Sequence, residues 1–127
     1  MTQDHSKPSS FDGLGISPKL LNILDSKKFT IPTPIQHQCI PHAIEGKDVV
    51  GIAQTGTGKT LAFGIPLIQR LATEKGQALI LVPTRELALQ VEESFMQIGR
   101  QVGLKTEVVI GGASSHSQIR GLRKKPH

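Results

Sequence analysis

Residues 53–60 have the types and spacing of a loop that binds phosphate, and in order they are Ala53, Gln54, Thr55, Gly56, Thr57, Gly58, Lys59 and Thr60. Glycines let main-chain N–H groups converge on phosphate oxygens without Cβ clashes, and the N-terminus of a following helix adds partial positive charge. The Lys59 ammonium would reach the β- and γ-phosphates, and the Thr60 hydroxyl would be a ligand of Mg²⁺. The loop therefore predicts a nucleoside triphosphate site with Mg²⁺, in which Lys59 and Thr60 are also the candidate catalytic residues.

The loop departs from the general phosphate-loop pattern at one position, because Ala53 stands where that pattern has glycine. Alanine keeps this position small, so we expect an intact loop. The structural alternative is a strand-to-helix turn that carries Gly-x-Gly-Lys-Thr and binds nothing. The loop by itself predicts neither the base nor the reaction, because kinases, GTPases, transporters and helicases all use one.

The elements around the loop predict an α/β fold. Continuous apolar runs predict three strands, over 48–53, 78–82 and 106–110. Capping residues and helical periodicity predict five helices, at about 18–27, 34–45, 59–72, from Thr84 to Gly103, and from Ser114 onward. Strands that alternate with crossover helices are typical of a parallel sheet.

Three segments together resemble the motifs of the DEAD-box ATP-dependent RNA helicases. Residues 29–36 (Phe-Thr-Ile-Pro-Thr-Pro-Ile-Gln) resemble the Q motif, residues 53–60 resemble motif I, and residues 83–88 (Pro-Thr-Arg-Glu-Leu-Ala) resemble motif Ia. They occur in the family's order, and the likeness runs from about Phe11 to the end. It implies that 11–127 is the N-terminal portion of the family's ATP-binding domain, with the Q motif at 11–36. That domain is a RecA-like P-loop parallel sheet flanked by helices, here incomplete at its C-terminal side.

The resemblance implies that Gln36 recognises adenine. A carboxamide presents a donor and an acceptor that match the N6 and N7 edge of adenine and mismatch guanine, which favours ATP over GTP. Phe29 matches the position that stacks on the base, and Thr33 the position that links this motif to the phosphate loop. Phe11 matches an isolated upstream aromatic, and core burial is the alternative for both phenylalanines. Lys28 departs from the glycine that is usual at the start of the motif, and we expect little effect.

The resemblance also implies contacts with the RNA backbone, by Pro83, Thr84, Arg85, Gly111 and Gly112. The last two match the double glycine that the family carries after its next strand. A hydroxyl and free N–H groups at a helix N-terminus suit a phosphate, and such contacts would be independent of base sequence and sensitive to salt. The alternatives are a surface salt bridge for Arg85 and a simple tight turn for the glycines.

Composition adds weaker indications. The net charge of +5 suits a polyanionic partner, although only 3% of the residues are aromatic, so no platform for stacking bases is visible. Residues 1–10 are predicted to be a disordered leader without the apolar core of a secretory signal. No apolar run reaches the length of a membrane span. Cys39 is the only cysteine, which fits a reducing, cytoplasmic location.

The chain carries no Asp-Glu pair after the third predicted strand, and the family's Asp-Glu-Ala-Asp box is absent. Hydrolysis needs carboxylates that hold Mg²⁺ and position the attacking water. We therefore expect ATP hydrolysis and RNA unwinding of a longer parent protein, and at most nucleotide and RNA-backbone binding of this piece. Its open apolar strands predict marginal stability. The alternatives are a truncated, non-catalytic nucleotide- or RNA-binding module, and another P-loop ATPase or a DNA helicase.

Overall fold

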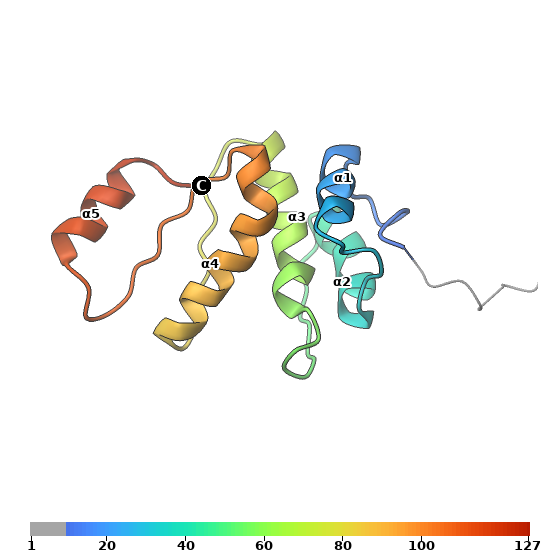
Figure 1. Ribbon diagram of the computed structural model, residues 1–127, viewed down its shortest axis with the longest axis horizontal. Helices are drawn as coiled ribbons and strands as arrows, with labels where there is room; N and C mark the ends of the chain where they lie inside the picture. Colours follow the sequence, from blue (N-terminus) through green and yellow to red (C-terminus); the bar gives the residue numbers. More distant parts are fainter. Residues whose placement is uncertain (1–9) are drawn as a thin grey trace, which may run out of the picture.

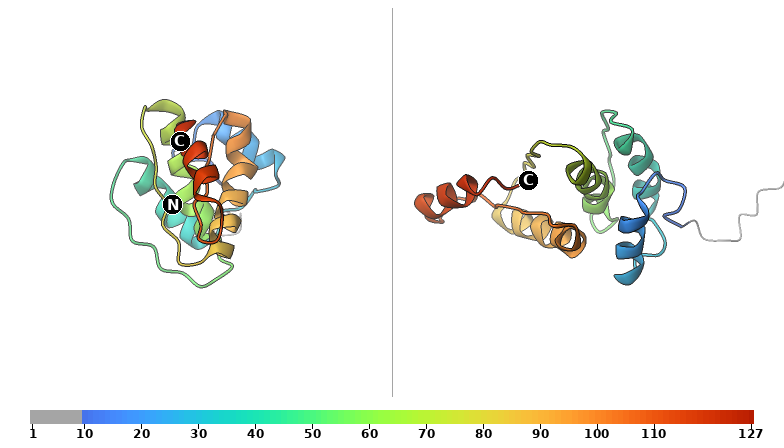
Figure 2. Two further views of the ribbon diagram at one scale, coloured as in Figure 1. Left: turned by 90° about the vertical axis from the view of Figure 1, so that its left-hand side faces the viewer. Right: turned by 90° about the horizontal axis from the view of Figure 1, so that it is seen from above.

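The computed structural model describes residues 10–127, and the elements of this part are all helical (Figure 1). In chain order they are α1 (Pro18–Ser26), α2 (Pro34–Ile44), α3 (Lys59–Thr73), α4 (Arg85–Gly99), the 3₁₀ turn η1 (Arg100–Val102) and α5 (Ser115–Arg123). Helices α1 to α4 form one packed group, while α5 stands apart at the opposite end (Figure 2). The leader predicted for 1–10 lies outside the described residues, apart from Ser10.

The helices begin and end where their capping residues predict. Ser17, Thr84 and Ser114 precede α1, α4 and α5, and each side-chain oxygen accepts a hydrogen bond from the backbone N–H three residues later. The left-handed Gly46 follows α2, and the left-handed Gly103 follows η1. The five predicted helices are thus confirmed, with ends that shift by one to a few residues.

Helix α3 lies at the centre of the core and carries the predicted phosphate loop at its N-terminus. Its residues Ile65 and Ile68 are fully buried, together with Ile98 of α4 and Ile40 of α2. Gly64 faces α4 so closely that a Cβ atom there would lie 2.5 Å from a ring carbon of Phe95. The core therefore fixes the direction of α3, and with it the direction of the loop.

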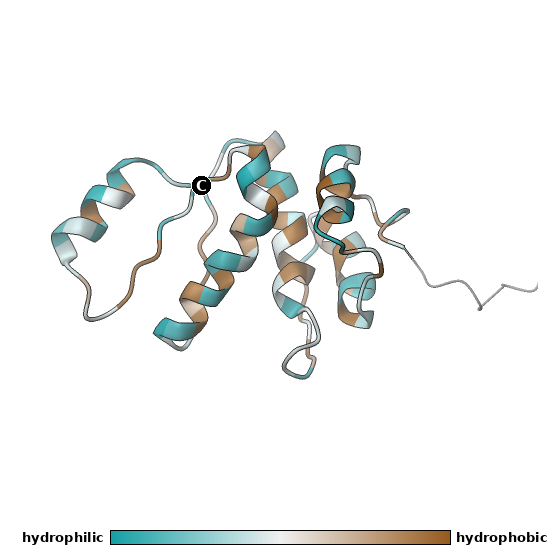
Figure 3. Cartoon of the chain, in the orientation of Figure 1, coloured by the Kyte–Doolittle hydropathy of each residue, from teal (hydrophilic) through white to brown (hydrophobic). Residues whose placement is uncertain are grey.

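The three predicted strands are not formed in residues 10–127, where the segments run extended without pairing as a sheet. Segment 78–82 shows the alternation of a strand, because Ile80 and Val82 pack against the core while Leu79 and Leu81 are 83% and 85% exposed. Segment 48–53 passes α2, and its Val50 and Ile52 are 90% and 91% exposed. Figure 3 shows the apolar, brown stretch of the third segment, which leads into α5.

At one end of the second and third segments, backbone hydrogen bonds go to His127 rather than from one segment to the other. The Ala78 N–H donates to the carbonyl of His127 (2.7 Å), and the His127 N–H donates to the carbonyl of Lys105 (2.8 Å). His127 thus lies between the two segments, which places them about two strand spacings, or ~10 Å, apart. At that distance the backbone groups of the two segments cannot bond to each other. Each segment has the sequence of a strand but lacks a neighbouring strand there.

Candidate nucleotide-binding site

The predicted phosphate loop is a tight turn that opens directly into α3. The Thr57 hydroxyl donates to the carbonyl of Gln54 at 2.5 Å, which closes the turn. Gly56 and Gly58 both have φ of +80°, a left-handed conformation that glycine adopts without a steric penalty. Gly58 is the N-cap of α3, so the loop ends where the helix begins.

The first turn of α3 has the features of an anion-binding site. Gly58 has no side chain with which to cap the helix, and the first turn contains no acidic residue. Within residues 10–127, the backbone N–H groups of Lys59, Thr60 and Leu61 therefore have no acceptor. Free N–H groups combine with the positive end of the helix dipole to favour an anion such as phosphate.

Lys59 and Thr60 lie in this first turn. The Lys59 side chain is exposed and belongs to neither of the ion pairs formed among the described residues. Thr60 is half-buried, and a single hydroxyl suits Mg²⁺, which takes its other oxygen ligands from phosphate and water. The described residues contain no group of three or more His, Cys, Asp or Glu side chains that could hold a metal by themselves.

Gln36 joins the Q-motif segment to the phosphate loop. The side chain is 4% exposed; its oxygen accepts from the Thr33 N–H (2.9 Å) and its nitrogen donates to the carbonyl of Gly58 (3.1 Å). That carbonyl also accepts the first intrahelical bond of α3, from Ala62. A carboxamide has two N–H groups and two oxygen lone pairs, so one of each is left for a ligand. Adenine recognition by Gln36 stays a prediction.

The other residues of the Q motif are buried to different degrees. Phe11 is 4% exposed inside the core, and Phe29 is half-buried against it. The Thr33 hydroxyl is buried without a hydrogen-bond partner in the described part of the chain, and a Cβ atom on Gly58 would lie 3.2 Å from it. Lys28 has φ of +63°, which explains why this position favours glycine in the family pattern.

The two segments predicted to contact RNA lie next to each other. Pro83, Thr84 and Arg85 are exposed at the start of α4. The Thr84 hydroxyl oxygen accepts from the Leu87 N–H (3.1 Å), and Arg85 donates through Nη1 to the carbonyl of Gly111 (3.1 Å). The contact of Arg85 is therefore with the double-glycine turn, and neither ion pair of the described residues includes it. RNA binding by this surface stays a prediction.

Sequence reasoning missed Gln69, which fastens the chain before α1 to α3. Its oxygen accepts from the Ser17 N–H (2.8 Å), and its nitrogen donates to the carbonyl of Gly15 (3.0 Å). The partners are more than fifty residues apart in sequence, so no local pattern indicates the contact. The sequence carries no signal for it, because Gln69 is one of several polar residues in the second half of α3.

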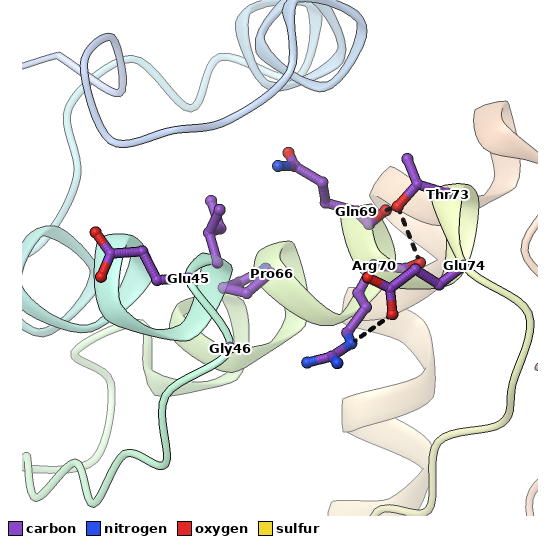
Figure 4. A pocket seen from close by; sticks show the side chains of 8 residues that line it. Glu45, Gly46, Pro66, Gln69, Arg70, Thr73 and Glu74 are labelled. Atoms are coloured by element: carbon purple, nitrogen blue, oxygen red, sulfur yellow. Dashed lines mark hydrogen bonds and ion pairs between the residues drawn. The ribbon is translucent and has the colours of Figure 1, made fainter.

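A cavity of about 150 Å³ lies at the far end of α3 from the loop (Figure 4), and it is lined by Ile44, Glu45, Gly46, Pro66, Gln69, Arg70, Thr73 and Glu74. The Arg70 guanidinium is paired with the Glu74 carboxylate at 3.1 Å. A hydrogen bond and the charge of Lys47 lower the pKa of the Glu45 carboxyl below its usual value, so this group is ionised at neutral pH. The two carboxylates beside this paired arginine would repel a triphosphate. The first turn of α3 is therefore the better candidate for the phosphate site.

Comparisons with known proteins agree with the motifs and the loop. The family model of the DEAD/DEAH box helicases matches residues 33–127. The chain belongs to this family.

Two relatives are close in sequence. The chain is 49% identical over 123 residues to the ATP-dependent rRNA helicase RRP3 of Candida albicans, covering 95% of this chain and 23% of that protein. It is 47% identical over 122 residues to the DEAD-box ATP-dependent RNA helicase 36 of Oryza sativa, covering 94% and 24%. The chain thus spans about a quarter of the length of these relatives.

Two solved structures are close in fold. A DEAD box protein from Methanococcus jannaschii has a TM-score of 0.81 at 38% identity, covering 89% of this chain and 32% of that one. The RNA helicase Prp28 from Chaetomium thermophilum, bound to ADP, has a TM-score of 0.81 at 34% identity, covering 96% and 32%. These likenesses confirm the RecA-like α/β class, even though no strand is assigned within residues 10–127.

Proposed function

We propose that this chain is the ATP-binding portion of an ATP-dependent RNA helicase. The observation that carries the proposal is the uncapped first turn of α3. Within residues 10–127 its three N–H groups have no acceptor, Lys59 has no ion-pair partner, and the carboxamide of Gln36 donates to the neighbouring carbonyl of Gly58. The triphosphate would lie on the N–H groups and the ammonium, and the remaining donor and acceptor of Gln36 would select adenine. Thr60 would contribute one ligand to Mg²⁺.

We propose that the same chain holds the RNA backbone at the exposed residues 83–85 and 111–112. An exposed helix N-terminus and a glycine turn beside it offer N–H groups to phosphate oxygens, which supports contacts that do not read base sequence. The net charge of +5 adds attraction for any polyanion. In the parent protein, ATP binding here and hydrolysis would be coupled to RNA unwinding or remodelling.

Hydrolysis is not proposed for these 127 residues. The chain carries no acidic residue after Glu107, so nothing follows the double glycine that could supply the carboxylates for Mg²⁺ and water. Incubation with ATP and detection of released phosphate tests this directly, and turnover that depends on Lys59 would contradict it.

Calorimetric titration of the chain with Mg·ATP and Mg·GTP tests the nucleotide site. We expect ATP to bind more tightly than GTP, and Lys59→Ala to weaken both by roughly 10- to 100-fold, because one charge-assisted contact contributes about 1.5–3 kcal/mol. Lys75→Ala is the matched control, since Lys75 is an exposed lysine just beyond the other end of α3. Equal losses in the two variants, or none in either, would contradict the site.

A further inference from the structure

The double-glycine turn is tied to the start of α4 by one side chain. The Arg85 guanidinium donates through Nη1 to the carbonyl of Gly111 at 3.1 Å, across a separation of 26 residues. Arg85 is the first residue of α4 and follows Thr84, the N-cap. The contact therefore sets the distance between the two segments that the proposed function assigns to RNA.

The second glycine of the turn lies against this guanidinium. A Cβ atom on Gly112 would lie 2.7 Å from Nη1 of Arg85, too close for two unbonded heavy atoms. Gly112 also has φ of +81°, whereas nothing lies within 4 Å of a Cβ atom built on Gly111. Glycine at 112 is thus favoured by the left-handed backbone of the turn, and a Cβ atom there would push the Arg85 guanidinium aside.

A second side chain fixes the other flank of the turn. The Ile110 N–H donates to the side-chain oxygen of Gln118 in α5 at 2.6 Å. Residues 110 and 111 are therefore held from two helices, by an acceptor on α5 and a donor on α4. The N–H groups of Gly111 and Gly112 take part in no hydrogen bond among residues 10–127 and point to no internal partner.

We infer that Arg85 is a positioning residue, which holds the double-glycine turn beside Thr84 so that the main-chain N–H groups of the turn can meet a phosphate. This inference rests on the proposed RNA-backbone surface and changes the role of one residue in it. Sequence reasoning assigned the charge of Arg85 to the phosphate itself. The geometry assigns it to a carbonyl oxygen, with Gln118 as the matching support on the other side.

The salt dependence of RNA binding separates the two roles. The probe is a fluorescein-labelled single-stranded RNA of mixed sequence, titrated at several KCl concentrations with the whole chain. A direct ligand contributes about 0.7 to the slope of log K against log[salt] per neutralised phosphate of a single strand, whereas neutral N–H contacts contribute little. For a positioning residue, Arg85→Ala weakens binding several-fold with a slope close to that of the original chain.

A double-mutant cycle with Gly112→Ala adds a second readout. If Arg85 acts through the turn, Gly112→Ala weakens RNA binding by a factor similar to Arg85→Ala, and the double variant is no worse than either. Arg85→Lys recovers part of the affinity, because an ammonium can still donate to the Gly111 carbonyl. Arg100→Ala, at the other end of α4, is the control for loss of one positive charge. A slope that falls by about 0.7 together with additive losses would overturn the inference.

Backbone dynamics of the free chain test the positioning role of Arg85 without RNA. This test therefore does not depend on the proposed RNA binding. In the free chain, Arg85→Ala and Gln118→Ala should each raise amide exchange and lower the NMR order parameters of residues 111–113, while those of α4 stay unchanged. Unchanged dynamics in both variants would overturn the inference whether or not RNA binds. If the original chain binds no RNA but the turn loosens as expected, the RNA proposal fails and the positioning contact stands.

Discussion

At the scale of single residues, position 36 joins the chain before α2 to the loop that opens α3. Its carboxamide bonds to the Thr33 N–H and to the Gly58 carbonyl, and it is buried between them. The motif predicted that this glutamine belongs to a nucleotide site. The bond to Gly58 could not be predicted, because it joins residues 22 apart and leaves no periodic or local pattern. Lys28 is the reverse case, since its left-handed backbone explains why glycine is usual there, which the sequence alone could not show.

Gln36→Ala should change both nucleotide selection and stability. The ratio of ATP to GTP affinity should fall toward one, because the remaining donor and acceptor for adenine are lost. The free energy of unfolding should fall by about 1–3 kcal/mol, since two internal hydrogen bonds are removed. Competition titrations and denaturant melts measure the two effects. Gln38→Ala is the control, because Gln38 is exposed on the same helix. Unaltered ATP selectivity in Gln36→Ala would rule out its role as adenine reader.

At the scale of elements, the helices follow from sequence and the strands do not. Ser17, Thr84 and Ser114 cap helices through bonds to residues three positions away, so a local reading finds them. A strand needs a neighbour that local sequence does not specify. Here His127 lies between Ala78 in one predicted strand and Lys105, just before the predicted strand 106–110. Segment 78–82 turns alternate side chains toward the core as a strand does, but it has no pairing partner among residues 10–127.

A substitution at the contact of α3 with α4 has two opposing effects on the stability of the chain. Gly64→Ala gains roughly 1 kcal/mol of helix propensity. The new Cβ atom would lie 2.5 Å from the ring of Phe95, which is 3% exposed and cannot retreat into solvent. Overpacking of this kind costs about 1–3 kcal/mol, so we expect a net loss of stability or no gain.

Thermal melts of Gly64→Ala, alone and with Phe95→Leu, measure this balance. The smaller side chain at 95 should relieve the clash, so the effect of Gly64→Ala should become less unfavourable in that background. Leu89→Ala serves as the control on α4, because Leu89 is exposed on its outer face. A Gly64→Ala variant that is clearly more stable than the original chain would contradict the close packing of the two helices.

At the scale of the whole molecule, the segments predicted as strands expose apolar side chains to solvent. Val50, Ile52, Leu79 and Leu81 are all more than 80% exposed, although each lies in a segment with the composition of a buried strand. An apolar surface with unpaired backbone groups beside it favours association. The marginal stability expected from the sequence stays a prediction.

The chain should therefore self-associate, and the double variant Leu79→Lys with Leu81→Lys should reduce this without lowering helix content. The charges would lie on the exposed face of segment 78–82, where two lysines block edge pairing. Sedimentation velocity and circular dichroism measure the two properties. Ile80→Lys is the contrast on the inner face, packed against the core, and should unfold the chain. A monomeric original chain with a sharp cooperative melt would contradict this account.

The most direct test of the central claim is a titration of the ¹⁵N-labelled chain with Mg·ATP, followed through its backbone amide signals. The triphosphate should bind the N–H groups at the start of α3 that have no acceptor within residues 10–127. The largest shifts should therefore fall on residues 56–61, with smaller ones at Thr33 and Gln36. Lys59→Ala should abolish these shifts at the same ATP concentration. Shifts centred on the cavity between Glu45 and Glu74, or none at 56–61, would contradict the account.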